Sequence, residues 1–257
     1  AANKLEFAPA VTLEGGLRES FYNTGTYFDQ SSTSTDLAVL SGYGRYGAVS
    51  GSVIPSGSGA AFTAEAWVKP DFVSTGGSIY DVIMTQGDTN NDRRFFLGLL
   101  DGRIVSCLGA ACTGTANVQT SVGTWTHIAV VVNPATTSIQ IYVNGTSVSV
   151  NPSSHSSWGN ISATPDLLIG RSAINIPTYR HFHGLINQVK IWDGALSAES
   201  VNESRRMYGS AGVRASANLR AHYSFDTPSS SVALDESGNG RNLGLFFVLT
   251  SDFVAGE

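Results

Sequence analysis

The sequence has little charge and no long apolar run. Asp, Glu, Lys and Arg make up only 14% of its 257 residues, against about 25% in typical soluble domains. No stretch approaches the roughly 18 consecutive apolar residues that indicate a membrane-spanning helix. The net charge is −5 and no basic tract occurs. We therefore expect no membrane span and no nucleic-acid partner, since binding to phosphates needs clustered Lys and Arg.

Cysteine is scarce, with only Cys107 and Cys112 in the chain. Two cysteines without nearby histidines make a poor zinc site. Gly109 lets the chain turn between them, so we expect a small-loop disulfide, with free thiols as the alternative. A disulfide would indicate an oxidising compartment, and hence a secreted or cell-surface protein. The first residues, 1–4, lack the charged and apolar regions of a signal peptide. They fit either a mature terminus left by cleavage or a chosen boundary within a longer chain.

Alternating apolar and polar residues dominate what is present, and they predict strands over 62–69, 139–143, 185–192 and 219–225. The run 127–132 is continuously apolar, as in a strand buried on both faces. The alternation also predicts which side chains share a face. In 185–192 it groups Leu185, Asn187, Val189 and Ile191 opposite Ile186, Gln188, Lys190 and Trp192.

Turn signals separate the strands. Asp101–Gly102 and Asn144–Gly145 each stand between two strand segments and predict tight hairpins. One segment, 198–208, has a helical pattern, with Ser197 as its N-cap and Gly209 as its stop. Many short strands with one short helix predict an all-β fold, in which two antiparallel sheets form a jelly-roll sandwich.

Three segments, FTAEAWVKP (62–70), GTWTHIAVVVNPATTSIQIYVNGTSV (123–148) and the stretch 167–201, carry a family resemblance. In this order they resemble laminin-G-like, concanavalin A-like domains of the "three" subtype, and they are also similar to pentraxins. The resemblance implies a concanavalin A-like sandwich. Because this architecture hosts lectins, adhesion modules, glycosidases and lyases, the fold alone does not give the function.

The segment 219–245 resembles the family's opening hairpin, which normally comes first. It either supplies closing strands for this domain or begins a second repeat. We expect one sandwich domain over 1–257, with 218–257 as its closing strands and a second repeat as the alternative.

The sequence offers little for catalysis. Glycosidases of this kind need two facing carboxylates, about 5 Å apart in retaining enzymes, and no predicted strand carries acids at such spacing. Glu65 stands alone beside Trp67, so we interpret it as structural, and His127 at a strand start as a packing residue. A polysaccharide lyase stays open as an alternative, because lyases can use Tyr, His and Arg of the kind found in 179–183.

Sugar sites combine an aromatic platform with polar side chains for the hydroxyl groups. Residues of these types occur in two long loops and one basic pair, and the pair would suit acidic sugars. These candidates are Trp158, His155, Asn160, Tyr179, Arg180, His181, His183, Arg93 and Arg94. Tyr22, Tyr43 and Tyr46 could add to such a surface. The alternative is structural: Trp158 caps an edge of the sandwich, and the two histidines of H-x-H face solvent. A metal site at these histidines is a further alternative.

The family resemblance implies calcium as the cofactor, and a calcium ion needs about six to eight oxygen ligands. The loop 87–94 is the richest in oxygens, and it offers Asp88, Asn90 and Asp92 as candidate ligands. Asp235 and Asn239 could also ligate, although a turn of this composition needs such residues for its backbone. Against calcium, no acid occurs in 171–181, where pentraxins carry them.

Taken together, these features predict an extracellular, non-catalytic carbohydrate-binding or adhesion module of lectin type. Its expected partner is a glycan or a cell-surface glycoprotein. The alternatives are a protein–protein interaction module of a larger surface protein and a polysaccharide lyase or glycosidase of the same fold.

Overall fold

The computed structural model describes residues 25–28, 46–55, 60–77, 79–87, 95–109, 111–151, 166–172, 179–207, 218–225, 231–246 and 253–254. These residues form two sheets that are antiparallel apart from one strand pair, together with one short α-helix. The predicted all-β sandwich is therefore confirmed. None of the described helices is long and apolar enough to cross a bilayer.

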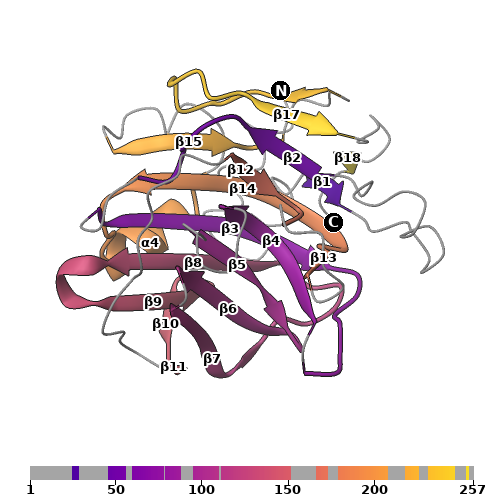
Figure 1. The fold of residues 1–257 in the computed structure, drawn as a ribbon, viewed down its shortest axis with the longest axis vertical. Coiled ribbons are helices and arrows are strands. Elements are labelled where there is room, and N and C mark those ends of the chain that lie inside the picture. The colour runs from indigo at the N-terminus through magenta and orange to yellow at the C-terminus, as the bar shows by residue number, and fades with distance from the viewer. Residues whose placement is uncertain are drawn as a thin grey trace, which may run out of the picture.

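The first sheet has eight strands, and β14 is its longest. Its strands from one edge to the other are β10 (Thr146–Val148), β9 (Ser138–Val143), β8 (Thr126–Asn133), β3 (Phe62–Pro70), β14 (Gly184–Asp193), β1 (Gly25–Phe28) and β18 (Phe253–Val254), with β15 (Leu219–Tyr223) also paired to β14. The succession β15, β14, β3, β8, β9 can be followed from top to bottom in Figure 1.

The second sheet has ten strands. In order they are β11 (Val150–Asn151), β7 (Ala111–Gln119), β6 (Arg103–Leu108), β5 (Phe95–Leu100), β4 (Tyr80–Gln86), β12 (Leu167–Ile169), β2 (Tyr46–Val49), β17 (Leu243–Phe246) and β16 (Val232–Ala233). The remaining strand, β13 (Tyr179–His181), pairs in parallel with β4.

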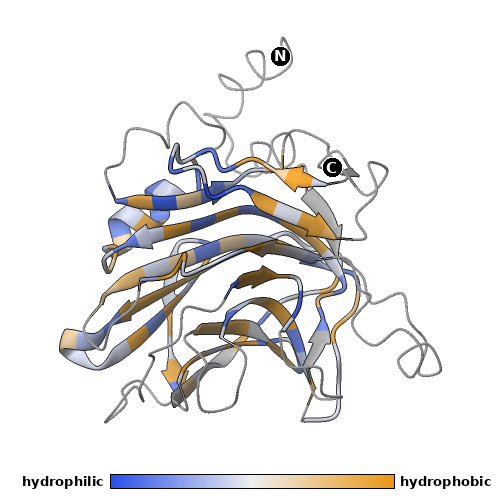
Figure 2. Ribbon diagram, turned by 45° about the horizontal axis from the view of Figure 1, so that its top comes forward, coloured by the Kyte–Doolittle hydropathy of each residue, from blue (hydrophilic) through white to orange (hydrophobic). Residues whose placement is uncertain are grey.

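The core lies between the two sheets, and alternation decides which side chains enter it. On β3, Phe62, Ala64, Ala66 and Val68 are buried in this core. In Figure 2 the strands accordingly alternate between hydrophobic and hydrophilic colours. Strand β8 is buried on both faces, as its continuous apolar run predicts. The confirmed alternation shows that burial of one face set the pairing of these strands.

Both predicted hairpin turns are present. Asp101 and Gly102 have φ values of 50° and 77°, and Asn144 and Gly145 have 50° and 79°. Positive φ at both central residues is the type I′ geometry, whose twist matches that of the flanking strands.

The helix α4 (Ala198–Ser204) starts where predicted but ends earlier than residue 208. The Ser197 hydroxyl caps it by accepting a hydrogen bond from the Ser200 amide at 3.1 Å. At the other end, the Ser204 carbonyl accepts from Lys190 Nζ at 2.7 Å, and the Arg205 carbonyl accepts from Trp67 Nε1 at 3.3 Å. The Ser204 carbonyl also accepts from the Met207 amide at 3.0 Å, so the end of the helix is held both by the chain that follows and by side chains of the sheet.

A β-bulge in β14 makes part of the predicted alternation wrong. Pairing with β3 shifts by one residue between Asn187 and Lys190, and Gln188 has a left-handed φ of 49°. The extra residue moves Ile186 into the core together with Val189 and Ile191. The predicted grouping of Ile186 with Lys190 is therefore incorrect, because one inserted residue inverts the faces on one side of the bulge.

Glu65 is fully buried on the other face of β3, beneath α4. Its carboxylate accepts hydrogen bonds from His127 Nε2 at 3.2 Å, from Trp192 Nε1 at 3.1 Å and from the Ser204 hydroxyl. Lys190 Nζ lies 3.5 Å away as the counter-charge. These contacts join three strands and the helix at one carboxylate, which confirms that Glu65 is structural.

Burial and neighbouring charges shift the pKa values of Glu65 and His127 in opposite directions. Burial disfavours ionised Glu65, but Lys190 and the hydrogen bond from His127 outweigh it and hold the pKa of Glu65 at about 2. Burial lowers the pKa of His127 below its usual 6.5, against the attraction of Glu65. We therefore take Glu65 as ionised and His127 as neutral at neutral pH.

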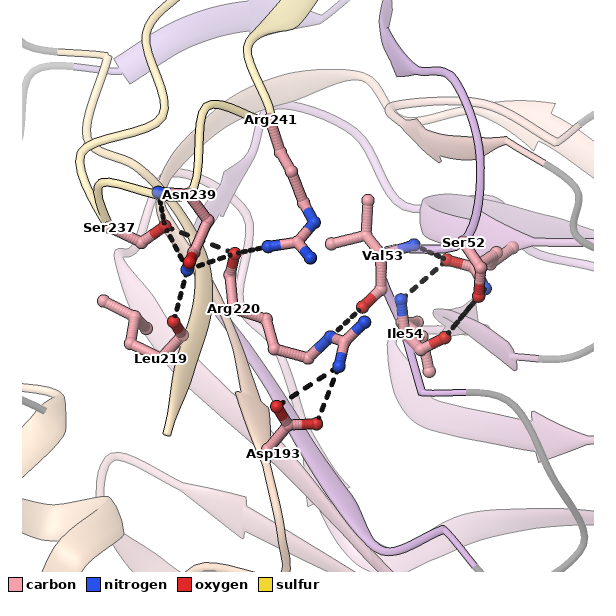
Figure 3. A network of polar contacts seen from close by, with 10 residues as sticks. Ser52, Val53, Ile54, Asp193, Leu219, Arg220, Ser237, Asn239 and Arg241 are labelled. Carbon is pink, nitrogen blue, oxygen red and sulfur yellow. Dashed lines mark hydrogen bonds and ion pairs between the residues drawn. The ribbon is translucent and has the colours of Figure 1, made fainter. Parts of the chain in front are cut away.

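The C-terminal strands complete both sheets. β15 pairs with β14 in the first sheet, and β17 pairs with β2 in the second. Figure 3 shows the polar contacts that hold this segment: Arg220 reaches Asp193 at 2.9 Å and the Val53 carbonyl at 2.6 Å. The Arg241 guanidinium donates to the Arg220 carbonyl at 2.8 Å. β15 and β17 are thus strands of the two described sheets, and the choice between closing strands and a second repeat stays a prediction.

The two cysteines form the predicted disulfide. Cys107 on β6 and Cys112 on β7 are paired across the hairpin, and Gly109 between them has a φ of 60°. The bond joins neighbouring strands of the second sheet.

We predict that replacing Glu65 with Gln lowers the free energy of unfolding by about 3 kcal/mol, because Lys190 is left buried without its counter-charge. Urea unfolding measures the change. Glu203→Gln, at an exposed position on α4, is the control and should stay within about 0.5 kcal/mol of wild type. The double variant with Lys190→Met should regain stability, and an unchanged midpoint for Glu65→Gln alone would contradict the prediction.

We also predict that acid destabilises the protein well above pH 4.5. Burial, with a contribution from Lys190, lowers the pKa of His222 from 6.5 to about 3. Between these values the unfolded chain binds a proton that the folded one does not, so stability present above pH 6.5 is lost as the pH falls. The expected slope is about 1.4 kcal/mol per pH unit for each such histidine. Urea midpoints at several pH values measure it, and His222→Gln should reduce the slope by one histidine's share. A flat profile from pH 6.5 to 4.5 would refute this.

Candidate ligand-binding surface

The two sheets differ in what their outer faces offer. The first sheet is covered by α4, whose Val201 is fully buried against Ala129 and Tyr142 of the sheet. The second sheet carries a partly exposed aromatic surface on β2 and β17. The outer face of the second sheet is therefore the candidate surface for a ligand.

Three side chains from distant parts of the sequence stack on this face. The rings of Tyr46 and Phe246 are 4.8 Å apart at an angle of only 8°. The guanidinium carbon of Arg171 lies 4.5 Å from the Tyr46 ring centroid. We call Arg171, Tyr46 and Phe246 the Tyr46 stack. Phe246 is 42% exposed, so the stack reaches the surface.

Strand pairing explains why these three residues meet. β2 is central, and its Tyr46 is opposite Phe246 of β17. On its other side β2 pairs with β12, and Arg171 follows β12 by two residues. Neighbouring strands lie about 4.8 Å apart, which is the spacing of stacked rings.

Small residues adjoin the stack. Ala48 and Gly244 are directly opposite each other on β2 and β17, on the same face as Tyr46. A side-chain carbon at Gly244 would lie 3.4 Å from the Phe246 ring. Beyond them Val232 and Leu234 are 37% and 59% exposed. The Phe246 ring therefore lies against Gly244, and the exposed side chains beside it are apolar.

The positive charge of Arg171 in the Tyr46 stack also acts on His181. Burial, together with the positive charge of Arg171, lowers the pKa of His181 to about 4. His181 is therefore neutral at neutral pH. Its Nδ1 is buried and has no hydrogen-bond partner among the described residues. The predicted candidate His181 thus lies near Arg171, whose Nε donates to the Ser172 carbonyl at 3.1 Å.

The chain path brings the other predicted candidates of this segment to the second sheet. The Gly170 amide bonds to the Ile83 carbonyl at 2.8 Å, and the Gly170 carbonyl accepts from the Phe182 amide at 3.0 Å. These hydrogen bonds tie Gly170, just after β12, to β4 and to the residue that follows β13. Tyr179 and Arg180 occupy the β13 positions opposite Tyr80 and Asp81 of β4.

His183 lies in a different setting from His181. Its ring is 6.5 Å from that of Phe72, edge to face. Between the two histidines Phe182 is fully buried in the core. In the parts of the chain that the structure describes, no three or more His, Cys, Asp or Glu side chains gather as a metal site would require.

Asp235 and Asn239 have structural roles. Asp235 accepts hydrogen bonds from the amides of His222, Ser237 and Arg241, at 3.0, 3.0 and 2.9 Å. Asn239 Nδ2 donates to the Leu219 carbonyl at 2.8 Å (Figure 3). The turn uses both side chains to hold its own backbone, which is the alternative to calcium ligation.

Carboxylates in the described strands are occupied by the protein. Glu65 accepts hydrogen bonds from His127, Trp192 and Ser204. Buried Asp81 accepts one from the Ser74 amide at 2.7 Å. Asp193 pairs with Arg220. Each of these acids already has a structural partner, and none is placed on the Tyr46 stack.

Several predicted site residues lie outside the described residues. They are the candidate ligand residues His155, Trp158, Asn160, Arg93 and Arg94, the candidate calcium ligands Asp88, Asn90 and Asp92, and the tyrosines Tyr22 and Tyr43. Of the Tyr46 stack, the sequence suggested only Tyr46. Arg171 and Phe246 were missed, because no local pattern marks residues that only sheet pairing brings together.

Solved structures of similar fold come from several organisms. A candidate carbohydrate-binding protein from Bacteroides ovatus is 20% identical with a TM-score of 0.60, over 88% of this chain. The chain spans 58% of that protein's length. A heptameric SAP-like pentraxin from Limulus polyphemus is 15% identical with a TM-score of 0.50, over 70% of this chain and 79% of its own.

A third structure is the CBM40 of the Ruminococcus gnavus IT-sialidase bound to α2,3-sialyllactose, 14% identical with a TM-score of 0.46. It covers 70% of this chain and 92% of its own. No curated protein shows significant sequence similarity to the chain. The family model Laminin_G_3 matches residues 41–202, and the chain therefore belongs to the concanavalin A-like lectin/glucanases superfamily.

Proposed function

We propose that this protein is a non-catalytic carbohydrate-binding module that holds glycans on the outer face of its second sheet. The observation that carries the proposal is the Tyr46 stack, in which two parallel aromatic rings and a guanidinium reach the surface together. The described strand acids are engaged in structural contacts, which supports binding over hydrolysis.

The chemistry of the surface suits a sugar. The C–H groups of a pyranose ring pack on exposed aromatic rings, and polar groups beside the rings select hydroxyl positions. Phe246 supplies exposed ring surface, while Arg171 supplies hydrogen-bond donors.

The setting of the protein is part of the proposal. The Cys107–Cys112 disulfide supports an oxidising, extracellular location. The Bacteroides ovatus relative, a candidate carbohydrate-binding protein by its description, supports a glycan as the ligand. We propose that such a glycan belongs to a polysaccharide or to a cell-surface glycoprotein, which would make the protein an adhesion module in the second case.

We predict that Phe246→Ala weakens glycan binding at least tenfold, since stacking on one aromatic ring is worth about 1.5 kcal/mol. Tyr46→Ala should also weaken binding, because the Tyr46 ring lies between Phe246 and Arg171 and supports both. A glycan array identifies ligands, and calorimetry on the full chain measures their affinity. Phe72→Ala removes another exposed phenylalanine (49%) and is the matched control. Equal binding by all three variants, or no glycan ligand at all, would refute the proposal.

Calcium stays a candidate cofactor, to be held by Asp88, Asn90 and Asp92. Adding EDTA to the same array separates the two routes. Binding through the Tyr46 stack alone persists in EDTA. Binding through calcium is lost, and it is lost again in the Asp88→Asn variant without EDTA.

A further inference from the structure

We propose that the loop of residues 234–242 covers the outer edge of β15 and so prevents a second copy of this chain from adding a strand there. No residue of the Tyr46 stack takes part. Three features support it: the position of β15 in the first sheet, the hydrogen bonds that reach its outer edge, and the origin of the loop in the other sheet.

Strand β15 is an edge strand of the first sheet. Among the described strands it pairs with β14 alone. Successive residues of a strand direct their backbone N–H and C=O groups alternately to its two sides. Arg220 and His222 are two residues apart, so both direct these groups to the same side of β15. An edge with such groups uncovered pairs readily with a strand of another molecule.

At His222 the loop takes the place of a neighbouring strand. The His222 amide donates to Asp235 Oδ1 at 3.0 Å, and the His222 carbonyl accepts from the Glu236 amide at 2.8 Å. In an antiparallel strand pair, one residue of the neighbouring strand supplies both of these bonds. Here a carboxylate oxygen replaces the carbonyl of that strand, so both backbone groups of His222 are already bonded.

The Arg220 carbonyl is covered by three side chains of the loop. It accepts hydrogen bonds from Arg241 Nη1 at 2.8 Å, from Asn239 Nδ2 at 3.1 Å and from the Ser237 hydroxyl at 3.2 Å (Figure 3). Asn239 Nδ2 also donates to the Leu219 carbonyl at 2.8 Å. These two carbonyls therefore have donors without any strand beside them.

The loop comes from the second sheet, where it joins β16 to β17. Asp235 holds its shape by accepting from the Ser237 and Arg241 amides at 3.0 and 2.9 Å. The Tyr223 hydroxyl of β15 donates to the Arg241 carbonyl at 2.7 Å and fixes the loop on the strand. Residues 234–242 contain no strand, so the loop covers the edge of β15 without offering a new edge.

A second copy is the partner that we assign to the uncovered edge, because β15 can pair with itself. Two antiparallel copies centred on Ala221 would place Arg220 of each copy opposite His222 of the other, about a two-fold axis. Burial, with a contribution from Lys190, lowers the pKa of His222 to about 3, so His222 is neutral at neutral pH. No like charges would then lie directly opposite each other in this pair.

Two variants of the full chain uncover the edge. The double variant Asn239→Ala/Arg241→Ala removes donors to the β15 carbonyls and keeps the backbone of the loop. Asp235→Ala removes the acceptor at the same edge. The matched control is Asn151→Ala/Arg206→Ala, which changes the same residue types at exposed positions outside the loop and β15. Melting temperatures show which variants are folded.

Sedimentation velocity over a range of protein concentrations measures association. The mean mass of each folded, uncovered variant should rise with concentration toward twice that of wild type, and the control should match wild type. A fluorescent peptide of residues 218–225 then tests whether β15 is the strand that pairs. The peptide should bind the uncovered variants and not the wild type. Methylation of the peptide's backbone amides at Arg220 and His222 should abolish this binding, because it removes the donors that pairing needs.

Three results would overturn the proposal. If the wild type binds the unmethylated peptide, the loop does not cover the edge. If a folded, uncovered variant neither associates nor binds the peptide, the loop only stabilises the fold. If such a variant associates without binding the peptide, the contact lies elsewhere. Hydrogen exchange of the wild type adds a test that needs no variant: the His222 amide should exchange as slowly as the amides that β15 donates to β14, and exchange at the rate of an exposed loop contradicts the proposal.

Discussion

The buried carboxylate of Glu65 is the contact on which the arrangement of the first sheet depends. It draws donors from β8, β14 and α4 to one point on β3. A buried anion is costly unless each lone pair has a donor, so this site tolerates only one placement of the helix. The helix ends where its carbonyls turn to Lys190 and Trp67. A single ion pair thus sets the position, the length and the orientation of α4.

The outer faces of the two sheets therefore differ. The outer face of the first sheet carries a buried polar cluster around Glu65, and no side chain of this cluster is exposed to a ligand. Among the described residues no helix covers the Tyr46 stack, and the strands there carry small residues between aromatic ones. Under the proposed function, structure and recognition occupy opposite faces of one sandwich, and a substitution on one face should leave the other unaffected.

The sequence predicts what local patterns determine. Alternation on β3, the two type I′ turns, the Ser197 cap and the disulfide need only neighbours in sequence, and all are confirmed. Patterns fail where one residue changes the register, as at Gln188, or where the partner is remote. Glu65 looked isolated because its donors lie 62 to 139 residues away. Phe246 and Arg171 join Tyr46 only through strand order, which no local window contains.

The pairing of β2 with β17 has a consequence for how the protein is made. β2 lacks its partner on one side until Gly244 has been synthesised and can pair with Ala48. β14 likewise lacks a partner at Val189 until Tyr223 has been synthesised. During synthesis both sheets would stay open-edged until almost the whole chain has left the ribosome. Such unpaired edges recruit strands of other molecules, so slow translation or truncation before residue 219 should favour aggregation over folding.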